Sequence, residues 1–90
     1  MHYIIKYTEQ ENIMYKRIEK TENTITELQT TINNLKSRGI HDYEIRCNKI
    51  SFTEFCDQQC NGFSLSTLAH DIYFADSKSI DNNLKQQFNL

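Results

Sequence analysis

The chain has 90 residues, of which 38% are hydrophobic, and its ten Lys and Arg against twelve Asp and Glu give a formal net charge of −2. This length allows one domain, residues 1–90, and the near-balanced charge excludes both a histone-like basic protein and a strong polyanion mimic. No apolar run approaches the roughly 20 residues that span a bilayer. The start of the chain alternates polar and apolar residues, so we expect no signal peptide there.

Alternation of apolar and polar residues in the first part of the chain predicts strands. Apolar and aromatic side chains alternate with polar ones from His2 to Thr8, and a second alternating run extends from Ile13 to Glu19. The polar residues 9–12 between them predict a four-residue loop, which is too short for a parallel crossover. The two runs therefore predict an antiparallel hairpin.

The period changes after Thr21, where apolar residues recur at helical spacing. The stripe consists of Ile25, Leu28, Ile32 and Leu35. Thr24 and Glu27 have the spacing of a capping box, with Thr21 and Asn23 as alternative caps. Gly39 then supplies the left-handed residue that ends many helices. The sequence therefore predicts a helix that packs on the hairpin.

Alternation returns from His41 to Cys47 and predicts a third strand. A turn at residues 48–49 and a short fourth strand around Ile50 are a further option. Ser51 and Glu54 repeat the capping-box spacing, and the apolar stripe that follows predicts a short helix ending at residues 61–62.

Two further helical stripes follow. Leu65, Leu68, Ala69 and Ile72 predict a helix capped by Ser64, although residues 72–74 would also suit a buried strand. Ile80, Leu84 and Phe88 predict a last helix that begins after Ser77 or Ser79. The fold class is α+β: a β-hairpin followed by a long helix and a third or fourth antiparallel strand, then short C-terminal helices.

The cysteines form the one candidate chemical site. They are Cys47, Cys56 and Cys60. An odd number argues against a closed disulfide framework, and without an export signal the thiols are expected to stay reduced. Two cysteines four apart on a helix point the same way, so Cys56 and Cys60 can share a zinc ion. Cys47 and His70 would complete a tetrahedral, structural site that binds no water.

Alternatives to this zinc site remain open. His41 or His2 would replace His70 if that side chain faces away, and all three thiols could instead be buried in the core, where cysteine is usually found. No family signature of a catalytic thiol surrounds any cysteine. The two glycines, Gly39 and Gly62, stand at predicted helix ends and form no phosphate-binding loop. We therefore expect a protein that is not an enzyme.

Two classes of partner are weighed from the charge pattern. Cations interleave with tyrosines in the first half, as on a sheet that stacks single-stranded nucleic acid: Lys6, Lys16, Arg17, Tyr3, Tyr7 and Tyr15. Five glutamates of residues 9–27 dilute this positive charge, so a solvated strand face is the expected role of these residues. The second half carries five carboxylates against two lysines: Glu54, Asp57, Asp71, Asp76 and Asp81 against Lys78 and Lys85. This acidic half could meet a basic groove on a larger protein, with Phe63, Tyr73 and Phe74 as anchors if they are exposed.

A small acidic domain rich in the Ile, Asn and Lys of AT-rich codons, without catalytic motifs, resembles in general character the anti-CRISPR proteins of phages and mobile elements. Those inhibitors of type II RNA-guided nucleases share no motif, and some bind metal. The resemblance implies a non-enzymatic inhibitor in the cytoplasm of a bacterial host. It would bind a basic lobe of the effector, which holds its heteroduplex in a basic channel, and block DNA or guide loading. The alternative is a small zinc-stabilised nucleic-acid-binding module.

Overall fold

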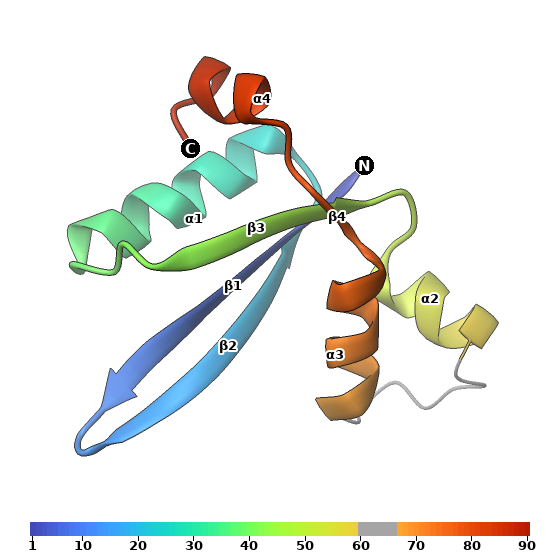
Figure 1. Ribbon diagram of the computed structural model, residues 1–90, viewed down its shortest axis with the longest axis horizontal. Helices are drawn as coiled ribbons and strands as arrows, with labels where there is room; N and C mark the ends of the chain where they lie inside the picture. The colour runs from blue at the N-terminus through green and yellow to red at the C-terminus, as the bar shows by residue number, and fades with distance from the viewer. Residues whose placement is uncertain (60–66) are drawn as a thin grey trace.

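The computed structural model describes residues 1–59 and 67–90, which form an antiparallel sheet with helices on both faces (Figure 1). The strands are β1 (His2–Glu11), β2 (Met14–Glu22), β3 (Tyr43–Asn48) and β4 (Lys78–Ser79). The helices are α1 (Ile25–Ser37), α2 (Phe52–Gln59), α3 (Thr67–Asp76) and α4 (Asn82–Gln87). The strand order in the sheet is β2-β1-β3-β4. This arrangement confirms the predicted α+β class.

Strand β1 lies between two hydrophobic clusters. Ile5 and Tyr7 pack in one cluster with Leu28, Ile32 and Leu35 of α1, and Leu84 of α4 joins it. Ile4 packs in the other cluster with Phe55, Cys56, Ala69, Tyr73 and Phe74 of α2 and α3. Successive side chains of a strand point to opposite faces, and Ile4 and Ile5 are both fully buried. The molecule therefore has three layers, with α1 and α4 on one face and α2 and α3 on the other (Figure 1).

The β1–β2 hairpin is longer and more tightly closed than predicted. Its register runs from Tyr3 opposite Glu22 to Glu11 opposite Met14, so the connection is a two-residue turn. The predicted four-residue loop is therefore wrong. Asn12 adopts a φ of 58°, a left-handed conformation that asparagine tolerates, and this permits the tight turn.

Helix α1 begins and ends as its sequence predicts. The Oγ1 atom of Thr24 accepts a hydrogen bond from the backbone N–H of Glu27 at 3.1 Å, which confirms Thr24 as the cap. Gly39 adopts a φ of 78°, and the N–H of Ile40 donates to the carbonyl oxygen of Leu35 at 2.9 Å. These are the features of a Schellman motif.

The second half differs from the prediction at two places. Ile50 is not in a strand: it packs against the α2 and α3 cluster, and the fourth strand is β4. Asp81 caps α4 in place of Ser77 or Ser79. Residues 72–74 belong to helix α3, which confirms the predicted helix over the alternative strand. The predicted end of α2 at residues 61–62 and the Ser64 cap lie outside the described residues. Among the helices described, none is long and apolar enough to cross a membrane.

Candidate functional site

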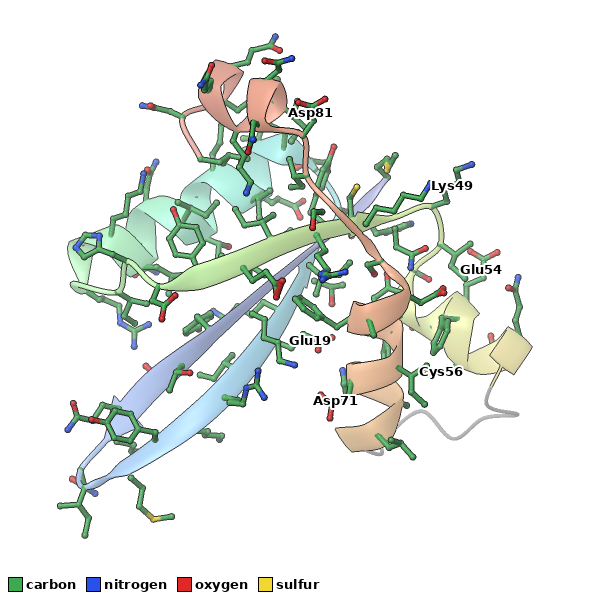
Figure 2. The ribbon with its side chains drawn as sticks, in the orientation of Figure 1. Glu19, Lys49, Glu54, Cys56, Asp71 and Asp81 are labelled. Carbon is green, nitrogen blue, oxygen red and sulfur yellow. The ribbon has the colours of Figure 1, made fainter. Side chains whose placement is uncertain are left out.

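The structure places two of the four predicted zinc ligands on opposite faces of the sheet. Cys47 pairs with Tyr3 in the β1–β3 ladder and packs against the α1 cluster. Cys56 is buried on α2, in the cluster on the other face (Figure 2). The two thiols therefore lie in separate apolar surroundings.

His70, the third predicted ligand, has other partners. Its ring stacks on Phe52 with centroids 4.1 Å apart, and its Nδ1 atom lies 3.5 Å from Oε1 of Glu19. Of the substitute ligands, His2 is hydrogen-bonded to Asn23 at 3.0 Å, and His41 is exposed. Cys60 lies outside the described residues.

Cys47, Cys56 and His70 are thus not brought together. A tetrahedral zinc site needs four ligands at about 2.0–2.3 Å from one ion. Within residues 1–59 and 67–90, no group of three or more His, Cys, Asp or Glu side chains could hold a metal ion. Zinc binding stays a prediction, which elemental analysis of the purified protein would test.

A cluster of ionisable side chains lies instead between α3 and the hairpin. It consists of Lys6, Glu19, His70 and Asp71, and we call it the α3 charge cluster. Lys6 of β1 stands opposite Glu19 of β2 in the ladder, and its Nζ atom lies 3.3 Å from Oδ1 of Asp71. Glu19 in turn contacts His70, so two cross-layer pairs connect α3 to the sheet. Figure 2 shows Glu19 and Asp71, one from each pair, between the hairpin and α3.

Phe74 strengthens this connection from the last turn of α3. Nζ of Lys6 lies 4.8 Å from its ring centroid, and the guanidinium carbon of Arg46 lies 5.1 Å from it. Arg46 also donates from Nη1 to the carbonyl oxygen of Ser77 at 2.8 Å. Cation–π contacts of this kind contribute about 0.5–2 kcal/mol each. The ring therefore contacts cations from both β1 and β3.

Beside the α3 charge cluster lies a depression of about 310 Å³, which Arg17 and Ile18 of β2 also line. Burial raises the pKa of Glu19, an effect that His70 and Lys6 partly oppose. Arg17 is exposed and has no ion-pair partner among the described residues. The lining side chains are charged or aliphatic, without a hydroxyl or thiol nucleophile. This depression suits the recognition of a charged group.

The acidic second half does not form one patch. Asp71 is paired with Lys6, and Asp81 accepts a hydrogen bond from the N–H of Asn83 as the cap of α4. Glu54 lies on α2, well apart from both in Figure 2. The expectation that Tyr73 and Phe74 are surface anchors is wrong, because both are buried between α3 and its neighbours. Phe63, the third expected anchor, lies outside the described residues.

Among the described residues, the largest group of exposed apolar side chains is at the end of the hairpin. Ile13, Met14 and Tyr15 are 93%, 71% and 72% exposed. Strand β3 pairs with β1 only from His2 to Tyr7, so residues 8–17 form a two-stranded ribbon that projects away from the helices (Figure 1). We call Ile13, Met14 and Tyr15 the hairpin tip. The sequence does signal it, since three nonpolar residues in a row follow a polar segment where a turn is expected.

Strand β2 is a second exposed feature of the hairpin. It is an edge strand of nine residues, and along its outer side the described part of the chain supplies no strand. Three of its cations have no ion pair within the described residues: Lys16, Arg17 and Lys20. The hairpin thus combines an apolar tip with a basic open edge.

Comparisons with known proteins found no matching family model, curated protein or solved structure.

Proposed function

We propose that this protein binds a larger protein through the hairpin tip and inhibits it without chemistry. The partner that the resemblance implies is a type II RNA-guided nuclease, whose DNA or guide loading the bound protein would block. The exposure of Ile13, Met14 and Tyr15 carries the proposal. Large apolar and aromatic side chains on a protruding element are typical anchors of protein–protein interfaces.

The position of the tip also supports binding. The ribbon of residues 8–17 extends beyond the third strand, so the tip can enter a cleft of a partner while the helices stay outside it. Near its base, Arg38 after α1 forms an ion pair with Glu9 of β1. Such a ribbon loses little conformational freedom on binding compared with a flexible loop, which favours affinity.

The experiment measures cleavage of target DNA by a purified type II nuclease with its guide RNA, with and without this protein. Co-elution of the two proteins from a sizing column measures binding directly. We expect the wild-type protein to bind and to inhibit cleavage. Ile13→Asp places a charge in the apolar contact and should weaken binding at least tenfold, as for an interface hot spot.

Leu68→Asp is the matched control. Leu68 is an exposed apolar residue of α3, 67% exposed, and lies away from the tip. The Leu68→Asp variant should bind the nuclease as the wild type does. Equal inhibition by Ile13→Asp and wild type would refute the role of the tip, and a wild-type protein that neither binds nor inhibits the nuclease would refute this partner.

Binding of single-stranded nucleic acid is the second candidate. The cations of β2 near Tyr15, which have no ion pair in the described part of the chain, favour it. Three phosphate contacts, one each for Lys16, Arg17 and Lys20, predict a roughly 20-fold loss of affinity between 50 and 200 mM salt. A labelled oligonucleotide measured at both salt concentrations tests this. Affinity that does not change with salt, or no binding, would reject it.

A further inference from the structure

The outer side of β2 carries backbone groups that no strand of the described chain satisfies. In a hairpin with a two-residue turn, the two residues that flank the turn, here Glu11 and Met14, exchange both of their backbone hydrogen bonds. Along the ladder, such hydrogen-bonded pairs then alternate with pairs that exchange no hydrogen bond. By this alternation every second residue of β2 bonds to β1. The N–H and C=O groups of the others point outward: Tyr15, Arg17, Glu19 and Thr21.

The side chains of these four residues share the face of the sheet that α3 covers. Lys6 stands opposite Glu19 in the ladder and contacts α3, which identifies this face. A residue that pairs with Arg17 from a neighbouring strand would lie on the same face, with Cβ atoms about 4.5–5.5 Å apart. It would therefore reach the depression of about 310 Å³ that Arg17 lines together with His70.

Charge decides what kind of strand this edge accepts. Lys16, Arg17 and Lys20 have no ion pair within the described residues, so a segment with carboxylates opposite them would be attracted. A second copy of this chain gains no net charge attraction. In an antiparallel pair of β2 strands centred on Ile18, Arg17 of each copy would face Glu19 of the other, but Lys16 of each would face Lys20 of the other, and like charges directly opposite are destabilising. Lysines on edge strands commonly oppose such self-pairing.

We infer that the outer edge of β2 binds an extended, acidic segment of the partner protein as an additional antiparallel strand. A carboxylate stands opposite Arg17, and an apolar side chain lies against Tyr15 at the tip. Backbone hydrogen bonds from Tyr15, Arg17, Glu19 and Thr21 supply the affinity, and the cations supply the specificity. The inference rests on the proposed function and names the chemistry of the partner segment.

The test uses the whole protein, labelled with ¹⁵N, and a ten-residue peptide that contains the segment Val-Glu-Thr-Val-Glu-Glu-Val. In an antiparallel register this segment places glutamates opposite Lys20, Arg17 and Lys16 and a valine opposite Tyr15. Titration to millimolar peptide should show binding and should slow amide exchange at Arg17, Glu19 and Thr21. A peptide with lysine in place of glutamate should not bind. Arg17→Ala should weaken binding about fivefold, as for an exposed ion pair. Lys36→Ala removes an equal charge from the end of α1 and should change nothing.

A second variant tests the backbone directly. Thr21→Pro removes an outward N–H that the β1–β2 ladder does not use, so the protein should fold and bind the peptide at least tenfold more weakly. No binding at millimolar peptide, or equal binding by Thr21→Pro and wild type, would overturn the inference. Binding of a single-stranded oligonucleotide in place of the peptide would also overturn it.

The nuclease assay separates this inference from the proposed function. If Thr21→Pro inhibits cleavage as the wild type does while Ile13→Asp does not, the tip carries the function and strand addition is wrong. If the peptide binds as described but the wild-type protein leaves the nuclease fully active, the edge assignment stands and the nuclease is the wrong partner.

Discussion

Tyr73 provides a sharp test of the core between α3 and the sheet. Its side chain is fully buried, and its hydroxyl donates a 2.7 Å hydrogen bond to the carbonyl oxygen of Ile50. The rings of Phe52 and Phe55 lie 5.4 and 5.3 Å from its ring centroid. Burial, with a smaller contribution from Glu19, raises the pKa of Tyr73 to about 12.

The sign of the effect follows from proton binding. Between the unfolded pKa of 10 and the folded pKa of about 12, the folded protein binds the phenolic proton more tightly than the unfolded chain. The raised pKa of Tyr73 therefore stabilises the folded protein in full below pH 10, and this stabilisation is lost as the pH rises through about 12. The raised pKa corresponds to about 3 kcal/mol in full, of which roughly half is lost by pH 11.

Tyr73→Phe removes both the hydrogen bond and the titration. We expect this variant to be less stable than wild type by about 1 kcal/mol at pH 7, because the hydrogen bond is lost. At pH 11 we expect it to be equal to the wild type or slightly more stable. Urea unfolding at pH 7, 9 and 11 measures the difference. Tyr15→Phe, at an exposed tyrosine, is the control and should give the same small difference at each pH. A Tyr73→Phe difference that does not change between pH 9 and 11 would refute the reasoning.

Four further substitutions test the first half of the fold by urea unfolding. Thr24→Ala removes the cap of α1 and should cost about 1 kcal/mol, whereas an unchanged midpoint would mean that another residue caps the helix. Gly39→Ala should cost about 1–2 kcal/mol from the left-handed φ of 78° alone, since no atom lies within 4 Å of the added methyl group; a neutral effect would contradict that conformation. Ile5→Ala should lower the free energy of unfolding by about 2–5 kcal/mol, because Ile5 is fully buried. Arg38→Ala breaks a partly exposed ion pair and should lower it by at most about 1 kcal/mol. A larger loss for Arg38→Ala than for Ile5→Ala would show that the ion pair matters more than the core.

The sequence predicts the first half of the fold well because its signals there are local. The alternation of β1, the stripe of α1 and the Thr24 and Gly39 ends each depend on neighbours within a few residues. The hairpin turn was misplaced because polar residues 9–11 look like a loop, although in an exposed ribbon they simply form a strand with both faces in solvent.

The candidate site depends on long-range contacts that spacing cannot reveal. Placing Cys47 and Cys56 in one zinc site required both to be on the same side of the sheet. Alternation along β3 and the packing of α2 put them on opposite sides. The adjacent Ile4 and Ile5 are the one local sign of burial on both faces. Likewise, nothing near His70 in the sequence indicates that Glu19, 51 positions earlier, is its partner.

The sharing of β1 by the two hydrophobic clusters has a consequence for how the protein unfolds. Loss of α3 from its face would leave Ile4 in water, and loss of α1 would do the same for Ile5, on a strand that both layers need. We therefore expect a single cooperative transition. During synthesis, Ile4 lacks its apolar partners on α3 until residues 67–76 have been made, so completion of this side of the molecule has to wait for the last quarter of the chain.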